Sequence, residues 1–199
     1  MTQRITHIAV FCGSKVGNQA AYLDAARETG RLLARQGIGI VYGGGRVGLM
    51  GAMADAALAE GGEVYGVMPK SLVDSEIAHT GLTHLHVVHT MHERKAKMAE
   101  LANGFVALPG GSGTLEEIFE QWTWAQLGIH QKPCGFLNIN GYYDPVHEMA
   151  QRMVAEGFML QSYADMLVFT NSLETILSRF RQYTPPPRKW QAPAAPIKP

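Results

Sequence analysis

The residues best suited to chemistry lie in the run PGGSGTLEE, at positions 109–117. Its glycines fall between an apolar run, 104–108, and a segment of helical period, where a buried strand turns directly into a helix. Backbone N–H groups at a helix start are unpaired and lie at the positive end of the helix dipole, so the turn favours a phosphate or carboxylate ligand. Glu116 and Glu117 would repel that anion unless they face another part of the ligand. The run therefore predicts anion binding and a reacting carboxylate within one turn.

Two more glycine-bearing turns follow predicted strands, at 12–15 (CGSK) and 42–51 (YGGGRVGLMG). A single such turn commonly just connects a strand to a helix, because glycine allows the positive φ that such a turn needs. Three turns at the same edge of a parallel sheet can surround a nucleotide-sized ligand. The middle turn fits the dinucleotide fingerprint only loosely, no acid ends the next strand, and no G-x-x-x-x-G-K-[ST] run is present. A mononucleotide is the remaining natural ligand.

Short apolar runs alternate with segments of helical period along the chain. We expect strands at 8–12, 38–42, 64–68, 85–88, 105–108, 134–139 and 166–169, and helices at about 18–35, 48–60, 91–102, after 113, at 144–156 and at 172–182. Strands that are apolar throughout predict a parallel sheet covered on both faces. The predicted fold is α/β, a Rossmann-like doubly wound parallel sheet in three αβα layers, with its site outside the carboxyl ends of the strands.

Length and composition indicate one domain, residues 1–183, followed by a tail, 184–199, whose closely spaced prolines predict disorder. The seventeen basic and seventeen acidic residues cancel, so the protein has no net positive charge to attract nucleic acid or an anionic membrane surface. No basic leader and no apolar run of membrane-spanning length is present, so we expect a soluble, cytoplasmic protein. Cys12 and Cys134 fall in strand-like runs, which predicts reduced core residues.

Six motifs together resemble one known family. In order they are FCGSKVG, YGGGRVGLMG, GGEVYGVMP, MHERKAKM, PGGSGTLEE and TWAQLGIHQKP, and the likeness covers residues 7–183. They resemble the LOG ("Lonely Guy") family of cytokinin riboside 5'-monophosphate phosphoribohydrolases, some of whose members carry the label lysine decarboxylase. The resemblance implies a Rossmann-like fold, a homodimer and no dissociable cofactor. It also implies hydrolysis of the N-glycosidic bond of an N6-substituted adenosine 5'-monophosphate, or of AMP, to free base and ribose 5-phosphate.

The resemblance also implies roles for particular residues. Arg94 in MHERK and Glu117 match the catalytic pair. The positions that match nucleotide contacts are Glu76, Lys95, Gly110, Gly111, Ser112, Gly113, Thr114, Glu116 and Thr123. From the other glycine turns and the pocket they predict, we add Gly13, Ser14, Gly44, Gly45 and Met91 as substrate-binding candidates. Ser75 departs from plant relatives, which often carry arginine there, and this leaves the base preference open.

Cleavage of the C1'–N9 bond develops positive charge on the ribose, so a carboxylate near C1' stabilises the transition state more than the substrate. Glu117 is the candidate for that role and for orienting or deprotonating the attacking water. The N–H groups of residues 111–114 hold the phosphate, and its binding energy fixes the reacting carbon in place. Arg94 is a second, charged clamp.

Simpler structural interpretations stand beside these. Thr114 to Glu117 also matches a capping box, in which Glu117 satisfies main-chain amides. Arg94, Lys95 and Lys97 also suit a solvated helix face. His84, His86, His89 and His92 span a strand, a turn and a helix start, and we predict no metal site. The functional alternative is a non-catalytic nucleotide or pterin-cofactor carrier; a pyridoxal-phosphate decarboxylase is a distant third.

Overall fold

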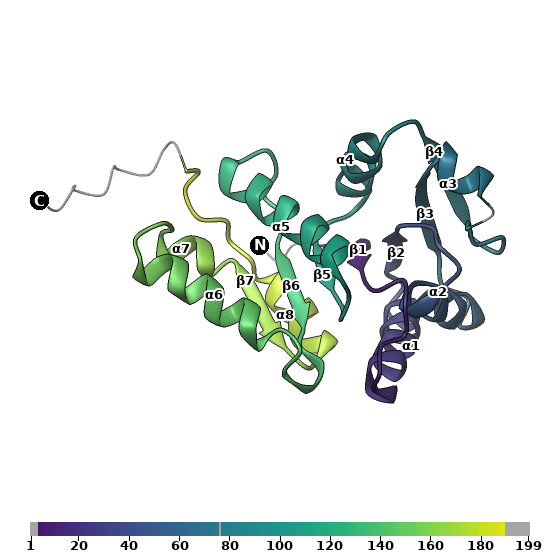
Figure 1. Ribbon diagram of the computed structural model, residues 1–199, viewed down its shortest axis with the longest axis horizontal. Helices are drawn as coiled ribbons and strands as arrows, with labels where there is room; N and C mark the ends of the chain where they lie inside the picture. Colours follow the sequence, from purple (N-terminus) through teal and green to yellow (C-terminus); the bar gives the residue numbers. More distant parts are fainter. Residues whose placement is uncertain (1–3, 76, 190–199) are drawn as a thin grey trace, which may run out of the picture.

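A seven-stranded parallel sheet forms the centre of the computed structural model, which describes residues 4–75 and 77–189 (Figure 1). The strand order is β4-β3-β2-β1-β5-β6-β7, and each neighbouring pair is parallel. The strands are β1 (His7–Phe11), β2 (Gly39–Tyr42), β3 (Val64–Pro69), β4 (His84–Val88), β5 (Phe105–Ala107), β6 (Cys134–Leu137) and β7 (Leu167–Thr170). The predicted α/β fold with a doubly wound parallel sheet is confirmed.

Helices cover both faces of this sheet (Figure 1). They are α1 (Ala20–Arg35), α2 (Gly48–Ala59), α3 (Lys70–Asp74), α4 (Met91–Leu101), α5 (Ser112–Leu127), α6 (Asp144–Ala155), α7 (Gln161–Ala164) and α8 (Leu173–Arg181), with a 3-10 turn η1 at Ile139–Gly141. One apolar core lies between the sheet and α1, α2 and α8, and a second lies between the sheet and α4, α5 and α6. The three-layer arrangement follows from strands that are apolar on both faces.

Helix α1 illustrates how the sequence produces this packing. Its buried residues, Ala26, Thr29, Gly30 and Leu33, recur at the spacing of one helix face. A Cβ at Gly30 would collide with the backbone carbonyl of Met53 on α2. The glycine therefore lets the two helices approach closely.

Several element boundaries differ from the expectations. Strand β6 ends at Leu137, two residues before the predicted end, because Asn138 begins a turn in which Asn140 adopts a left-handed φ of 52°. Helices α3 and α7 were not predicted. Residues 184–189 of the predicted tail have no helix or strand, and Lys189 N donates to the Gln126 carbonyl at the end of α5, 3.0 Å away. The rest of the tail lies outside the described residues.

The sheet reverses its winding direction between β1 and β5. From β1 the chain adds β2, β3 and β4 on one side, and then β5, β6 and β7 on the other. The loops after β1 and β5 therefore diverge, and they leave a crevice at the carboxyl ends of these strands. Within the part of the chain that the structure describes, none of the helices is both long and apolar enough to cross a bilayer.

Candidate active site

A buried ion pair lies at the carboxyl edge of the sheet. Arg94 Nη1 on α4 donates to Glu117 Oε1 on α5 across 2.6 Å, and the two side chains are only 11% and 12% exposed. Arg94 Nε also donates to the Val67 carbonyl near the end of β3, 3.0 Å away. The two residues predicted as a catalytic pair, 23 positions apart in sequence, are thus in direct contact.

Local sequence explains the position of Arg94. The side chain of Thr90 caps α4 by accepting from Glu93 N at 3.1 Å, and the Glu93 carboxylate accepts from His89 N at 2.9 Å. This fixes the first turn of the helix, one residue before Arg94. On the facing loop, a Cβ at Gly43 would collide with Arg94 Nη2. Glycine at that position gives the guanidinium its space, a role that the loose fingerprint of the YGGGRVG loop did not reveal.

Two of the simpler interpretations are wrong. The N-cap of α5 is Gly111, without a side-chain capping bond, and Glu117 extends to Arg94 rather than to its own main chain. Arg94 and Lys95 are buried, so they do not form a solvated face. Lys97 alone of the three fits that interpretation, since it pairs with Glu100 at the helix surface.

Burial raises the pKa of Glu117 above its usual value, and Arg94 offsets part of that increase through its charge and hydrogen bond. Burial and the nearby Glu117 charge also raise the pKa of the Cys12 thiol, which stays neutral. Cys12 and Cys134 are free and buried, as predicted. Burial and the Arg94 charge therefore act in opposite directions on the pKa of the Glu117 carboxyl group.

A second polar cluster joins the same two helices further out. Lys95 Nζ donates to Glu116 at 2.5 Å and to Glu120 at 3.0 Å, although only Glu116 was predicted. Residues 116, 120 and 123 share one helix face, so the i,i+4 spacing from Glu116 is the signal that identifies Glu120. Thr123 lies beyond them and donates to the Phe119 carbonyl of its own helix at 2.8 Å. A ligand contact by Thr123 remains a prediction.

A pocket of about 360 Å³ occupies the crevice between the loops after β1 and β5. It is lined by Gly13, Ser14, Lys15, Val16, Gly17, Tyr22, Leu49, Pro109, Gly110, Gly111 and Tyr142. Gly13 and Ser14 of the first turn therefore meet Gly110 and Gly111 of the third turn there. The predicted residues 112–114 and the Arg94–Glu117 pair are not part of this pocket's lining. A larger hollow of about 770 Å³ runs along α6 and contains none of the predicted residues, so size alone does not identify the site.

The middle glycine turn is divided between two places: Leu49 lines this pocket and its N–H donates to the Gly13 carbonyl at 3.0 Å, whereas residues 43–46 lie elsewhere along the same edge. Gly44 accepts from His79 N at 2.8 Å, and Arg46 N donates to the Ile77 carbonyl at 3.1 Å, so this turn pairs with the segment after α3. Gly45 forms an isolated bridge with Ala78. Neither Gly44 nor Gly45 lines the pocket between the other two turns.

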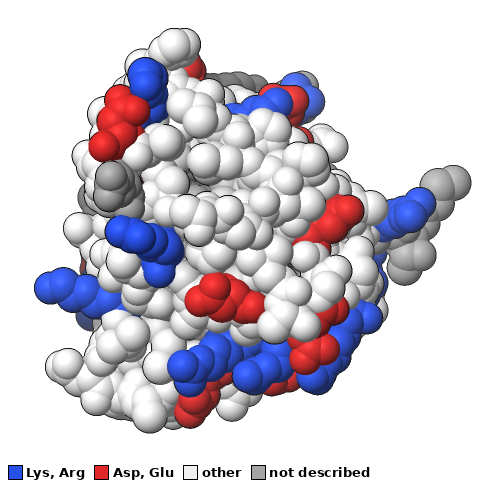
Figure 2. All heavy atoms as spheres, turned by 90° about the vertical axis from the view of Figure 1, so that its right-hand side faces the viewer, with Lys and Arg blue, Asp and Glu red and all other residues white. Residues whose placement is uncertain are grey.

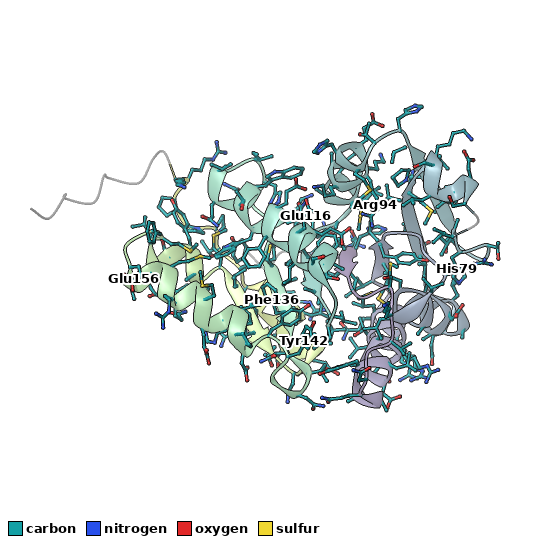
Figure 3. All side chains as sticks on the ribbon, in the orientation of Figure 1. His79, Arg94, Glu116, Phe136, Tyr142 and Glu156 are labelled. Atoms are coloured by element: carbon teal, nitrogen blue, oxygen red, sulfur yellow. The ribbon has the colours of Figure 1, made fainter. Side chains whose placement is uncertain are left out.

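Figure 3 labels Arg94, Glu116 and Tyr142, which come from α4, α5 and the turn before α6.

One predicted substrate-binding residue, Met91, belongs to neither the ion pair nor the pocket. Met91 is 46% exposed at the start of α4, one turn before Arg94 and Lys95. Glu76 lies outside the described residues. Among the residues that are described, no three histidine, cysteine, aspartate or glutamate side chains gather as a metal site would require.

Comparisons with known proteins are consistent with this geometry. A family model described as "Possible lysine decarboxylase" matches residues 50–180. A probable cytokinin riboside 5'-monophosphate phosphoribohydrolase from Oryza sativa subsp. japonica is 46% identical over 181 residues, covering 91% of this chain and 81% of the relative. A cytokinin riboside 5'-monophosphate phosphoribohydrolase from Rhodococcoides fascians is 47% identical over 175 residues, covering 87% of this chain and 88% of the relative.

Solved structures with the same fold are more distant in sequence. The molybdenum cofactor carrier protein from Chlamydomonas reinhardtii is 22% identical, with a TM-score of 0.67, and the match covers 90% of this chain and 98% of that protein. The molybdenum cofactor binding protein from Rippkaea orientalis is 21% identical, with a TM-score of 0.64, over 89% and 98% of the two chains. At these identities the likeness concerns the fold alone.

Proposed function

The chain belongs to the family of cytokinin riboside 5'-monophosphate phosphoribohydrolases, and from that premise we propose that it hydrolyses the N-glycosidic bond of an adenosine 5'-monophosphate, N6-substituted or not. Water attacks C1' as the C1'–N9 bond breaks. Its hydroxyl group stays on C1', giving ribose 5-phosphate, and its other proton goes to the released base. The observation that carries this proposal is the buried pair of Arg94 and Glu117. Glu117 lies in the second turn of α5, next to a helix start whose N-cap makes no side-chain hydrogen bond.

The chemistry assigns Glu117 to the anomeric centre. A carboxylate there stabilises the positive charge of an oxocarbenium-like transition state and orients or deprotonates the attacking water. Arg94 holds that carboxylate by an ion pair and favours its ionised form, which offsets part of the rise in pKa that burial causes. Because the pair is largely removed from water, its electrostatic effect on the reacting carbon is stronger than in solvent.

The phosphate is assigned to the start of α5, a helix of 16 residues whose N-cap offers no side-chain bond. The backbone N–H groups of residues 111–114 are the donors at the positive end of the helix dipole. Gly13 and Ser14 face the same pocket from the loop after β1. The family resemblance assigns Lys95, Glu116, Thr123 and Glu76 to nucleotide contacts. Gly44, Gly45 and Met91 are further substrate-binding candidates from the middle glycine turn and the start of α4.

A lysine decarboxylase is disfavoured on physical grounds. Such an enzyme forms a Schiff base through a lysine whose pKa is lowered, so that the amine is neutral and nucleophilic. Burial alone would lower the pKa of Lys95, but its hydrogen bonds to Glu116 and Glu120 raise it instead. The lysine nearest the catalytic pair is thus held as an ammonium ion.

The test is a product assay on Glu117→Gln with AMP and a panel of N6-substituted nucleoside monophosphates. We expect kcat to fall by about 10²–10⁴, because the amide cannot act as a base or neutralise developing positive charge. The dissociation constant of the nucleotide should change by less than about tenfold, since the phosphate contacts are intact. The panel also determines which base the enzyme prefers.

Glu100→Gln is the matched control, because Glu100 forms an exposed pair at the end of α4, away from the site. Its turnover should equal that of the wild type. Unimpaired turnover in Glu117→Gln would remove that residue from its role. Tight nucleotide binding by the wild type with no product over hours would favour the non-catalytic carrier instead.

We further propose a homodimer in the cytoplasm. The two free, buried thiols suit a reducing compartment. At the edge of the sheet, Leu85 and Val87 on β4 and Leu72 on α3 are exposed apolar residues. Figure 2 views the molecule from this side and shows a broad uncharged area with charged residues around it. An exposed apolar edge of this kind supports association with a second copy.

A further inference from the structure

We propose that Tyr142 is a positioning residue that aims the phosphate-binding amides of the PGGSGT turn. This inference rests on the proposed function, because it assigns a residue to the phosphate end of that site. Tyr142 lies in the turn after β6, 32 positions away from the glycine it contacts, and is outside every motif that predicted the site.

Three successive carbonyl oxygens of the turn each accept a hydrogen bond from another part of the chain. Tyr143 Oη donates to the Leu108 carbonyl at 2.5 Å, Gly13 N donates to the Pro109 carbonyl at 3.1 Å, and Tyr142 Oη donates to the Gly110 carbonyl at 2.6 Å. The first and third donors come from adjacent tyrosines. The turn is therefore held from outside, residue by residue.

Holding a carbonyl also holds the next amide. A peptide unit is planar and trans, so the C=O of Gly110 and the N–H of Gly111 point in opposite directions from one rigid plane. When Tyr142 fixes that carbonyl, the Gly111 N–H is fixed pointing away from Tyr142. That N–H is the first of the donors assigned to the phosphate.

The only other hydrogen bond of Gly111 among the described residues is longer, from Leu115 N to the Gly111 carbonyl at 3.3 Å. A Cβ built at Gly111 or at Gly113 would meet nothing within 4 Å, so no packed neighbour fixes the peptide on that side. The open space is where ligand atoms would lie. Glycine also has the largest conformational freedom of any residue, so an unanchored turn would lose more entropy on binding the phosphate.

The turn that carries Tyr142 is itself anchored. Tyr143 N donates to Asn138 Oδ1 at 2.7 Å, and Asn140 Nδ2 donates to Gln19 Oε1, ahead of α1, at 2.7 Å. The Tyr142 ring packs edge-on against Tyr22, with centroids 5.6 Å apart. Tyr143 is fully buried, whereas Tyr142 is 40% exposed at the pocket wall. Removal of the Tyr142 hydroxyl therefore affects the glycine turn without opening the core.

The test is Tyr142→Phe, which keeps the ring and removes the donor. We expect the inhibition constant of ribose 5-phosphate and the KM for AMP each to rise about three- to tenfold, the change that loss of one hydrogen bond produces. The inhibition constant of the free base should not change, because the proposed function assigns this turn to the phosphate and not to the base. A purely structural role would weaken both inhibitors together or lower the thermal midpoint, and either result would overturn the proposal.

Tyr163→Phe is the control, since it removes a hydroxyl that donates to the Pro187 carbonyl at 3.3 Å, away from the pocket. Both inhibition constants should stay at wild-type values in that variant. An active wild type with unchanged ribose 5-phosphate inhibition in Tyr142→Phe would overturn this proposal alone. A wild type that neither hydrolyses the nucleotides nor binds ribose 5-phosphate would overturn the proposed function and this inference with it.

Discussion

Two opposing influences act on the carboxyl group of Glu117. Burial favours the neutral form, and the guanidinium of Arg94, 2.6 Å away, favours the carboxylate. The net pKa is raised, which brings the group closer to neutral pH, where a general base works best. The native state binds this proton more readily than the unfolded chain, so ionisation of Glu117 costs stability as pH rises from 4.5 through the raised pKa.

The pH profile of kcat/KM measures the pKa of Glu117 that results from burial and from Arg94. We expect an acid limb with its midpoint above 4.5, because activity requires the carboxylate and is lost as Glu117 takes up a proton. Arg94→Met removes the influence that lowers the pKa of Glu117, so the acid limb of its residual activity should move to higher pH. The measurement is the initial rate of base release from AMP between pH 4 and pH 8.

Arg94→Lys is the control for that series, because it keeps a positive charge near Glu117 and should move the limb less. The phosphate of AMP also titrates near pH 6, but it does so equally with all three proteins. Identical limbs in the wild type and both variants would show that Glu117 is not the titrating group.

At the residue scale, sequence motifs located the reacting groups but not their supports. Arg94 and Glu117 belong to local patterns whose chemistry is visible in a few letters. Tyr142 donates to a carbonyl 32 positions away, and no periodicity links the two. Gly43 matters because a guanidinium from α4 fills the space beside it, which only the packed structure reveals.

At the element scale, α4 and α5 are joined by one lysine between two carboxylates on successive turns. Lys95 is nearly buried, whereas Glu116 is exposed and Glu120 is partly buried. If the ammonium group is removed, the two glutamates remain four residues apart with like charges, and such pairs destabilise a helix. Because the bonds to glutamate raise the pKa of Lys95, its stabilising contribution is fully present below about pH 10.5 and is lost as pH rises past the raised value.

Lys95→Met should lower the free energy of unfolding at pH 7 by about 1–3 kcal/mol, the range for hydrogen bonds between charged groups with one partner largely buried. Urea denaturation measures this loss. Lys97→Met is the matched control, and it should cost less than about 1 kcal/mol because the Lys97–Glu100 pair is a surface pair. Equal losses in the two variants would contradict a structural link between α4 and α5.

The same scale separates the elements that sequence predicts well from those it does not. The central strands are continuous apolar runs, and each lies close to its expected position. Helices α3 and α7 have five and four residues, too few for a helical period to be visible. The end of β6 depends on the left-handed conformation of Asn140, which asparagine tolerates but does not require.

At the scale of the whole molecule, the strand order turns local motifs into one site. The alternation of strands and helices predicted a parallel sheet, but the reversal between β1 and β5 is a property of the three-dimensional order. That reversal brings the turns at 12–15 and 109–113 to one pocket, which Leu49 also lines, and leaves residues 43–46 of the middle turn beside it. Composition contributes only the absence of net charge, which suits a small-molecule ligand.

The uncovered edge strand is the other feature at this scale, and it predicts the oligomeric state. Val87 on β4 is 52% exposed, so Val87→Glu is tolerated in a monomer but places an unpaired charge in an interface. We expect light scattering to give about twice the chain mass of 21.7 kDa for the wild type, and Val87→Glu to raise the dimer dissociation constant at least about 100-fold, since an unpaired buried charge costs at least about 3 kcal/mol. Phe158→Glu changes an apolar residue that is 86% exposed after α6, and it should remain dimeric. A wild type of single-chain mass, or an unchanged dimer in Val87→Glu, would show that β4 is not the interface.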